Sequence, residues 1–256
     1  MLRAYGKTDR GRVRTINEDS LGIDERQQLV VVADGMGGES AGEVASRMVV
    51  EAVTRHVARE FPAWNPQQLW PFGYDPSVSE VANVLRTAVH LANAEIREIA
   101  TATPALRGMG TTVVAALVHG ARLAVAHVGD SRLYLRSGDG VRRLTLDDSW
   151  MASVLANDPD ADQAALRQHP MRHAITNVVG VRSPTTVHVT EAVLFGGELL
   201  VLTTDGVHDV LDDDQIARVV ENGKSLSEIA ERLVHAALES GSRDNCTSLV
   251  AQYLPR

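Results

Sequence analysis

The stretch Gln28–Gly38 reads QLVVVADGMGG, and the rest of the chain can be interpreted outward from it. Its first part, Leu29–Ala33, is continuously apolar and rich in valine, which predicts a strand covered on both faces. Asp34 follows where the chain leaves the core, and Gly35 beside it lets another group approach the backbone closely. A carboxylate in this position suits a hard metal ion, although a polar residue in an ordinary turn has the same pattern.

Three further acids stand near glycine at strand edges. Asp130 follows the expected strand 122–128, Asp205 follows the apolar run 199–202, and Asp244 precedes the alternating run 246–251. If the fold brings these acids and Asp34 to one end of the sheets, their like charges destabilise one another unless cations neutralise them. The sequence therefore predicts a site for cations at the strand ends.

Composition restricts the class of protein and its partners. The chain has 256 residues, of which 44% are hydrophobic, so it can build a large core. The net charge of −8 argues against nucleic acid and anionic membrane as partners. One cysteine permits no intrachain disulfide, and no apolar run approaches the roughly 20 residues of a membrane helix. We expect a cytoplasmic protein.

Periodicity predicts pairs of helices between groups of strands, which indicates a layered α+β fold. Asp212, with Gln215 three residues later, predicts a capping box at a helix start. The expected helices cover 41–60, 78–101 and 226–240, and the expected strands cover 4–8, 21–23, 28–33, 111–119, 122–128, 132–136, 187–192, 198–204 and 246–251.

Two further segments carry expectations. Residues 61–76 hold four prolines and the large rings of Trp64 and Trp70, so this loop should pack on the body. Residues 149–180 are mostly polar and interrupted by prolines, which suggests a small helical subdomain inserted over the sheets, here called the flap. No composition shift marks a boundary, so we expect one domain over 1–256.

Six motifs together resemble the PPM family, the type 2C metal-dependent protein Ser/Thr phosphatases, in their compact bacterial form. They occur in the family's order and span almost the whole chain, which makes the resemblance specific. The motifs are Arg14 with Asn17-Glu18-Asp19, Val32-Ala33-Asp34-Gly35-Met36-Gly37-Gly38, Gly108-Met109-Gly110-Thr111-Thr112, His127-Val128-Gly129-Asp130-Ser131-Arg132, Thr204-Asp205-Gly206 and Arg243-Asp244-Asn245.

The resemblance implies an α+β fold with a central sandwich of two antiparallel β-sheets flanked by helix pairs, in four layers α/β/β/α, and a two-metal site at one end. Asp34 would bridge the two ions, and the carbonyl of Gly35 would support the second. Asp205 and Asp244 would bind the first ion. Asp130, together with Asp205, would hold a third, weaker ion.

The resemblance also assigns residues around the metals. Arg14 would grip the substrate phosphate, Asp19 would order metal-bound water, and Asn245 would support the ligands from behind. Each residue has a plainer interpretation. Arg14 could be a surface arginine, Asp19 a turn residue, and Asp130 the cap of the turn before the next strand.

The implied chemistry agrees with these residue types. Carboxylates and carbonyls suit Mn²⁺ or Mg²⁺, and no cysteine or histidine in the proposed ligand set favours zinc. Two ions roughly 4 Å apart can activate a bridging water for in-line attack on phosphorus, and an arginine can bind two phosphate oxygens. The implied activity is removal of phosphate from phosphoserine and phosphothreonine in proteins.

The chain departs from the family pattern at two places. Met36 stands where some members carry a histidine read as a general acid, and Asp148 stands where many bacterial members have a histidine before the flap. The leaving group therefore has no obvious proton donor; water at the metals, His169 and His173 are the candidates.

The partners implied by the resemblance are phosphorylated proteins and a Ser/Thr kinase with its targets, and we expect a monomer. A pseudophosphatase that binds phosphoproteins without turnover is the main alternative, and the complete set of acids argues against it. A two-metal hydrolase of small phosphates or phosphodiesters is another, which kinetics on different substrates would separate. A calcium-binding structural protein would need a regular acid-rich loop, which is missing.

Overall fold

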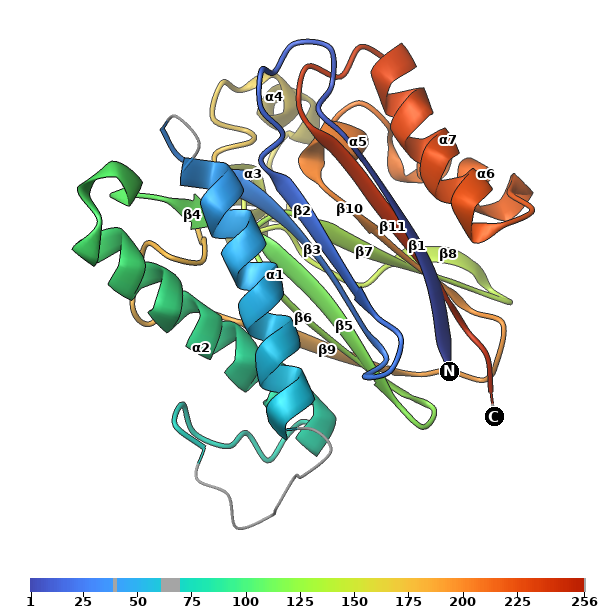
Figure 1. Ribbon diagram of the computed structural model, residues 1–256. Helices are drawn as coiled ribbons and strands as arrows, with labels where there is room; N and C mark the ends of the chain where they lie inside the picture. Colours follow the sequence, from blue (N-terminus) through green and yellow to red (C-terminus); the bar gives the residue numbers. More distant parts are fainter. Residues whose placement is uncertain (39–40, 61–69, 256) are drawn as a thin grey trace.

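The computed structural model describes residues 1–38, 41–60 and 70–255. Two antiparallel sheets stack face to face (Figure 1). The first sheet has the order β1-β11-β10-β7-β8, and the second has the order β2-β3-β5-β6-β9 with β4 paired to β3. The first sheet contains β1 (Leu2–Asp9), β7 (Arg132–Ser137), β8 (Gly140–Arg143), β10 (Leu199–Thr203) and β11 (Cys246–Tyr253). The second contains β2 (Asp19–Asp24), β3 (Leu29–Met36), β4 (Gly110–Thr111), β5 (Val113–His119), β6 (Arg122–Val128) and β9 (His188–Val193).

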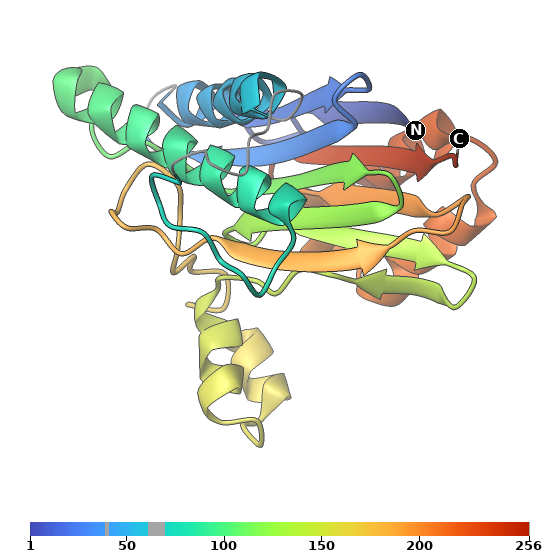
Figure 2. The ribbon, with the colours of Figure 1, turned by 90° about the horizontal axis from the view of Figure 1, so that it is seen from below.

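Helices cover the outer face of each sheet, which gives four layers (Figures 1 and 2). The long helices α1 (Ala41–Glu60) and α2 (Glu80–Ala102) pack on the second sheet. The helices α6 (Asp213–Asn222) and α7 (Leu226–Glu239) pack on the first, after the single turn α5 (Asp205–His208). The predicted sandwich with helix pairs is confirmed.

The apolar run in β3 is divided between two cores. Val30 and Val32 face the other sheet and pack with residues such as Leu200 and Leu202 of β10. Leu29, Val31 and Ala33 face the opposite way, against α1 and α2. Successive strand residues point to opposite faces, so a run without polar residues is what a strand between two layers requires.

Several predicted elements agree closely with the structure. Helix α1 has the predicted bounds, and the capping box of α6 is present, since Asp212 accepts from the backbone of Gln215 and Gln215 accepts from that of Asp212. Helix α2 begins at Glu80, two residues later than predicted, because Ser79 caps it by accepting from the backbone of Ala82.

Other elements differ from the prediction. Strand β8 (Gly140–Arg143) was not predicted; two of its four residues are arginines, and it forms the edge of its sheet. The predicted strand over 111–119 is divided into β4 and β5 at Thr112. The register against β3 continues across the division, with Gly35 opposite Thr111 and Val32 opposite Val114, but the N–H of Asp34 donates to the side-chain Oγ1 of Thr112. The predicted strand 198–204 ends at Thr203.

The loop before α2 can be compared with its prediction only in part. Residues 61–69, which include Trp64, lie outside the described residues. The remainder does pack on the body: Trp70 contacts the core between α1, α2 and the second sheet, and the ring of Phe72 stacks on His90 with 4.9 Å between centroids.

The flap, residues 149–180, carries two short helices, α3 (Trp150–Asn157) and α4 (Gln163–Gln168). They project away from the sandwich at one end (Figure 2). Across the described ranges, none of the helices is both long and apolar enough to cross a bilayer.

Candidate metal centre

The register of the two sheets brings the predicted acids together at one edge of the sandwich. This edge is formed by the ends of the strands and not by an outermost strand. In the first sheet, Thr203 at the end of β10 lies opposite both Arg132 at the start of β7 and Ser248 near the start of β11. In the second sheet, Asp19 lies opposite Asp34. Asp130 joins the end of β6 to β7, Asp205 follows β10, and Asp244 precedes β11, so all five acids meet at this edge.

Asp34 is held by its backbone. Its N–H donates to Oγ1 of Thr112 at 3.0 Å, and its carbonyl accepts from the N–H of Thr112 and from Oγ1 of Thr111. Oγ1 of Thr112 also pairs with Oγ of Ser131 at 2.7 Å. The Gly-Met-Gly-Thr-Thr motif is therefore architectural, and it fixes Asp34 relative to the segment that carries Asp130.

Gly35 has no space for a side chain. A Cβ there would collide with the carbonyl of Gly42 at the start of α1, and it would lie 2.8 Å from the carbonyl oxygen of Glu18. The N–H of Gly35 donates to that same carbonyl at 3.1 Å. Close packing around the glycine lets the start of α1 approach the end of β3, beside Asp34.

Asp19 is buried, with 7% of its surface exposed. Its Oδ2 accepts hydroxyl hydrogen bonds from Thr204 at 2.9 Å and Thr247 at 2.6 Å, whereas its buried Oδ1 has no partner among the described residues. Burial raises the pKa of Asp19 to about 7, helped by the charge of Asp205 and opposed by the two hydroxyls.

The neighbouring carboxyls repel one another. Burial, followed by the charge of Asp205, raises the pKa of Asp34 and of Asp130 well above the usual range. Burial and then the charge of Asp244 raise the pKa of Asp205, which is in hydrogen-bonding contact with Asp34. Oδ1 of Asp205 has no partner among the described residues. Asp19 and Asp130 are buried and Asp34 and Asp205 are half-buried, so negative charges on these acids destabilise one another.

Asp244 differs, because an arginine already contacts it. Nη2 of Arg14 lies 2.6 Å from Oδ2 of Asp244, and both side chains are partly exposed. Asn245 holds the loop that carries Arg14: its Nδ2 donates to the carbonyls of Arg10 and Ile16 at 2.9 Å each, and its Oδ1 accepts from the N–H of Glu18 at 2.8 Å.

The structure thus places Arg14 on an acid predicted to bind metal. Of the candidate proton donors, His169 stacks on the ring of Trp150, whereas Nδ1 of His173 lies 3.0 Å from Oδ2 of Asp209, beside the group of acids. Cys246 begins β11 directly behind Asp244 and Asn245. It is fully buried, its Sγ lies 3.3 Å from the carbonyl of Gly206, and burial raises the pKa of its thiol to about 11.

Sequence reasoning missed Asp209. Its side chain is 31% exposed, and partial loss of solvation, then the charge of Asp205, raises the pKa of its carboxyl to about 7. The spacing of four residues from Asp205 was the available signal, because positions i and i+4 share one face of a helical turn. His208 between them is buried and held neutral, with its pKa far below the usual range because of burial.

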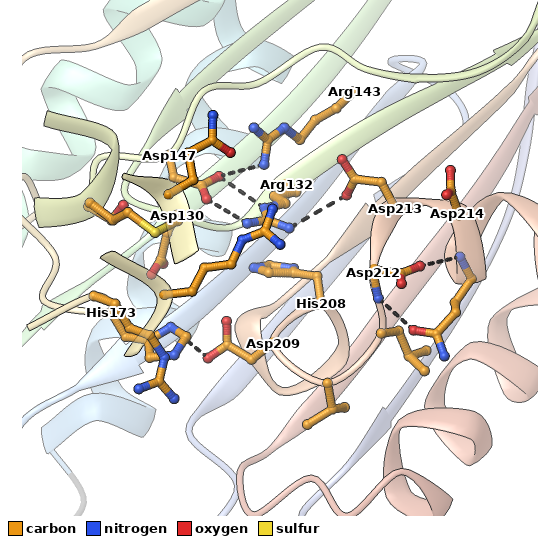
Figure 3. A pocket seen from close by; sticks show the side chains of 18 of the residues that line it. Asp130, Arg132, Arg143, Asp147, His173, His208, Asp209, Asp212, Asp213 and Asp214 are labelled. Atoms are coloured by element: carbon orange, nitrogen blue, oxygen red, sulfur yellow. Dashed lines mark hydrogen bonds and ion pairs between the residues drawn. The ribbon is translucent and has the colours of Figure 1, made fainter. Parts of the chain in front are cut away.

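A pocket of about 840 Å³ adjoins the acids, between the flap and the segment from α5 to α6 (Figure 3). Asp130 and Asp209 line it from the side of the candidate centre. Asp147 lies between Arg132 and Arg143, with 2.6 Å from its Oδ2 to Nη2 of Arg132.

The donors fit a hard divalent cation, although they do not form a finished cage. Within the part of the chain that the structure describes, no three histidine, cysteine, aspartate or glutamate side chains are arranged as a ready metal site. The unpaired buried oxygens of Asp19 and Asp205 and the raised pKa values nevertheless indicate that positive charge would stabilise the group. The donors at this edge are oxygens, which favours Mn²⁺ or Mg²⁺ over zinc.

Comparison with known proteins gives whole-chain matches. The family model described as Protein phosphatase 2C matches residues 8–243. The "Serine/threonine phosphatase stp" of Listeria innocua is 32% identical over 98% of this chain and 96% of its own length. The "Serine/threonine protein phosphatase PstP" of Mycobacterium tuberculosis is 33% identical over 98% of this chain, which spans 45% of that longer protein.

Solved structures agree with the sequence matches. The catalytic domain of PstP in complex with two manganese ions has a TM-score of 0.78 and 32% identity, covering 99% of this chain and 98% of that one. The serine/threonine phosphatase Stp1 from Staphylococcus aureus has a TM-score of 0.82 and 31% identity, with coverages of 99% and 95%. The resemblance in the motifs extends to the entire fold, and the chain belongs to the protein phosphatase 2C family.

Proposed function

We propose that this chain removes phosphate from phosphoserine and phosphothreonine in proteins, with two Mn²⁺ or Mg²⁺ ions bound among the acids at the sheet edge. The observation that carries the proposal is the group of buried and half-buried carboxyls with raised pKa values, in which one oxygen each of Asp19 and Asp205 has no partner among the described residues. Such a group is unfavourable unless cations bind to it. The two manganese ions in the PstP catalytic domain, a family member of the same fold, support this assignment.

The ligands follow from the positions described above. Asp34 would bridge both ions, Asp205 and Asp244 would bind the first, and the Gly35 carbonyl would support the second. Asp130 would hold a third, weaker ion with Asp205. The charge of Asp205 acts on the pKa of both Asp34 and Asp130, which supports a ligand group centred on Asp205.

The protein's own residues would then position the substrate. Ions bound here would activate water as the nucleophile and offset charge on the phosphate. Arg14 reaches the carboxylate of Asp244, so its guanidinium is close enough to bind two oxygens of a phosphate lying on the ligand group. Asp19, which two hydroxyls hold, would orient water at its unpaired oxygen, and Asn245 would keep the Arg14 loop in place.

Several wider features belong to the same proposal. The substrates would be phosphorylated proteins, including a Ser/Thr kinase and its targets, and the chain would act as a cytoplasmic monomer. The residues 1–256 would work as one domain in which the flap, residues 149–180, is a subdomain. The negative net charge and the single buried cysteine support a protein that avoids nucleic acid and acts in a reducing compartment.

The test is hydrolysis of p-nitrophenyl phosphate with Mn²⁺, with Mg²⁺ and with chelator. The variants are Asp205→Asn and, as a matched control, Asp139→Asn in an exposed turn. We expect metal-dependent turnover that falls at least about 100-fold in Asp205→Asn. Replacing a residue that only supports a metal ligand already lowers activity by up to about 100-fold, and losing a ligand should cost at least as much. The control should keep full activity.

Phosphopeptides follow as substrates once turnover is seen. A preference for phosphoserine and phosphothreonine peptides over small phosphates would support the protein substrate. Absence of turnover with either metal, from protein shown to be folded by circular dichroism, would exclude the enzyme and favour a phosphoprotein-binding module.

A further inference from the structure

Asp148 lies at the root of the flap, between β8 and α3, and its side chain is 14% exposed. Its carboxylate accepts three hydrogen bonds from three separate segments. Oδ2 accepts from the N–H of Gly129 at 2.9 Å and from Nδ2 of Asn177 at 2.8 Å, and Oδ1 accepts from Nε2 of His188 at 2.8 Å. One carboxylate therefore joins the start of the flap to the chain returning from it, to β9, and to the loop before Asp130.

The backbone of Asp148 repeats two of these connections. Its N–H donates to the carbonyl of Gly129 at 3.0 Å, and its carbonyl accepts from the N–H of Thr176 at 2.7 Å. The next residues continue the pairing, with an isolated bridge between Ser149 and Ile175. Both ends of the flap thus meet at Asp148.

Gly129 occupies a position that suits glycine alone. Its φ is +97°, which disfavours any residue with a side chain, and a Cβ would lie 2.7 Å from Cγ2 of Thr112. Oγ1 of Thr112 pairs with Oγ of Ser131, the residue after Asp130, at 2.7 Å, and it also accepts from the N–H of Asp34. The position of Asp130, one residue after Gly129, is therefore tied on one side to Asp34 and on the other to Asp148.

We propose that Asp148 is a positioning residue that couples the flap to Asp130: its carboxylate holds both ends of the flap and the Gly129 backbone in one arrangement. Loosening this carboxylate frees the flap and displaces Asp130 together. The effect on turnover rests on the role proposed above for Asp130, whereas the coupling itself does not.

The variants separate hydrogen bonding from charge. Asp148→Ala removes all three acceptor contacts. Asp148→Asn can keep them, because its oxygen accepts from Gly129 and Asn177 while its amide donates to His188, whose neutral ring has one accepting nitrogen. Asp162→Ala is the matched control: Asp162 is another flap aspartate, and it caps α4 by accepting from the N–H groups of Ala164 and Ala165.

Hydrogen exchange on the full chain, at a pH where histidine is neutral, measures the coupling with or without metal. In Asp148→Ala the amides of Gly129, Asp148 and Thr176 should exchange roughly 10–100-fold faster, since two or three hydrogen bonds are lost. Amides in the buried strand β5 report any global loss of stability. Asp148→Asn should stay within about threefold of the wild type, and Asp162→Ala should change only amides of α4.

Two results would overturn the proposal. One is exchange at Gly129 and Thr176 that Asp148→Ala leaves unchanged; the other is an Asp148→Asn variant that behaves like Asp148→Ala. If Asp148→Ala does not fold, His188→Ala carries the test. It removes one contact from a partly exposed side chain, so faster exchange at Asp148 by up to about tenfold supports the coupling, and no change opposes it.

Kinetics distinguish positioning from general stability. With p-nitrophenyl phosphate at saturating Mn²⁺, Asp148→Ala should lower kcat, and adding it to Asp130→Asn should cause no further loss, because both changes act on one residue. Fully additive losses would oppose the coupling. A wild type without turnover would instead contradict the proposed function, and the exchange data would still decide this inference.

Discussion

Asp147 lies on one side of Asp130 and the predicted metal-binding acids lie on the other, and the surroundings of the two are opposite. At the root of the flap, Asp147 accepts from Nε and Nη2 of Arg132 at 3.0 and 2.6 Å, and Arg143 lies 3.5 Å away. At the sheet edge, Asp19 and Asp205 each keep a buried oxygen without a partner in the described residues. Asp147 is therefore neutralised by arginines of the same chain, whereas Asp19 and Asp205 would be stabilised by cations bound from solution.

The largest effect on stability should come from removing Asp147, the carboxylate that is paired with arginines. Asp147→Ala leaves the guanidinium of Arg132, which is 16% exposed, without its bidentate partner. We expect the free energy of unfolding to fall by about 3–5 kcal/mol, as measured by urea denaturation. The double variant Arg132→Met with Asp147→Leu should recover most of this loss. A single variant as stable as Asp139→Ala would contradict the comparison.

Removing one of the acids at the sheet edge should change the stability of the metal-free protein in the opposite direction. Asp34→Asn removes a half-buried carboxyl whose pKa is held well above the usual range, first by loss of solvation and then by the charge of Asp205. In chelator near pH 7 we expect the free energy of unfolding to rise, because the variant no longer carries a carboxyl whose charged form is disfavoured in the folded state. With Mn²⁺ present the variant should lose this advantage. Destabilisation in chelator would contradict it.

The pH dependence of stability sharpens the same contrast. The pKa of Asp19 is about 7 in the folded protein, against about 4 in an unfolded chain, so the folded state holds the extra proton between those values. Stability of the metal-free protein should therefore fall as pH rises from about 4 to 7, and then level off. Urea denaturation of wild type and Asp19→Asn across this range isolates the contribution. Identical slopes would contradict the raised pKa.

The smallest effect should come from a contact between the flap and the segment beside the candidate centre. His173 of the flap contacts Asp209 beside the candidate centre, and both side chains are partly exposed. His173→Ala should change the free energy of unfolding by less than about 1 kcal/mol, because exposed ion pairs contribute little. Thermal unfolding checks this. A larger loss would mean that the flap is held mainly by this pair and not by Asp148.

The fold was largely predictable from local pattern. The apolar run in β3, the periodicity of α1 and the capping box at Asp212 each depend on neighbouring residues, and each was confirmed. Strand β8 escaped because a short edge strand with two arginines has no apolar alternation. The periodicity of apolar residues does not indicate whether a strand lies at the edge of a sheet or in its middle.

The sequence predicted which residues form the candidate site, but not the contacts between them. The motifs identified the acids, and the register of the strands brought them to one edge. The contacts of the site depend on residues far apart in sequence: Arg14 meets Asp244 across 230 positions, and Asp148 joins Gly129 to His188. No local signal gives such pairings, and the motifs do not contain Asp148.

The single thiol of the chain has a practical consequence. Cys246 is buried directly behind Asp244 and Asn245, with its pKa raised to about 11, so a thiol reagent cannot attack it while β11 stays in place. The rate at which such a reagent labels the native protein therefore measures how often β11 detaches near Asp244 and Asn245. Because there is one cysteine, the chain carries a reporter that needs no engineering, and slower labelling in Mn²⁺ would register ion binding without any substrate.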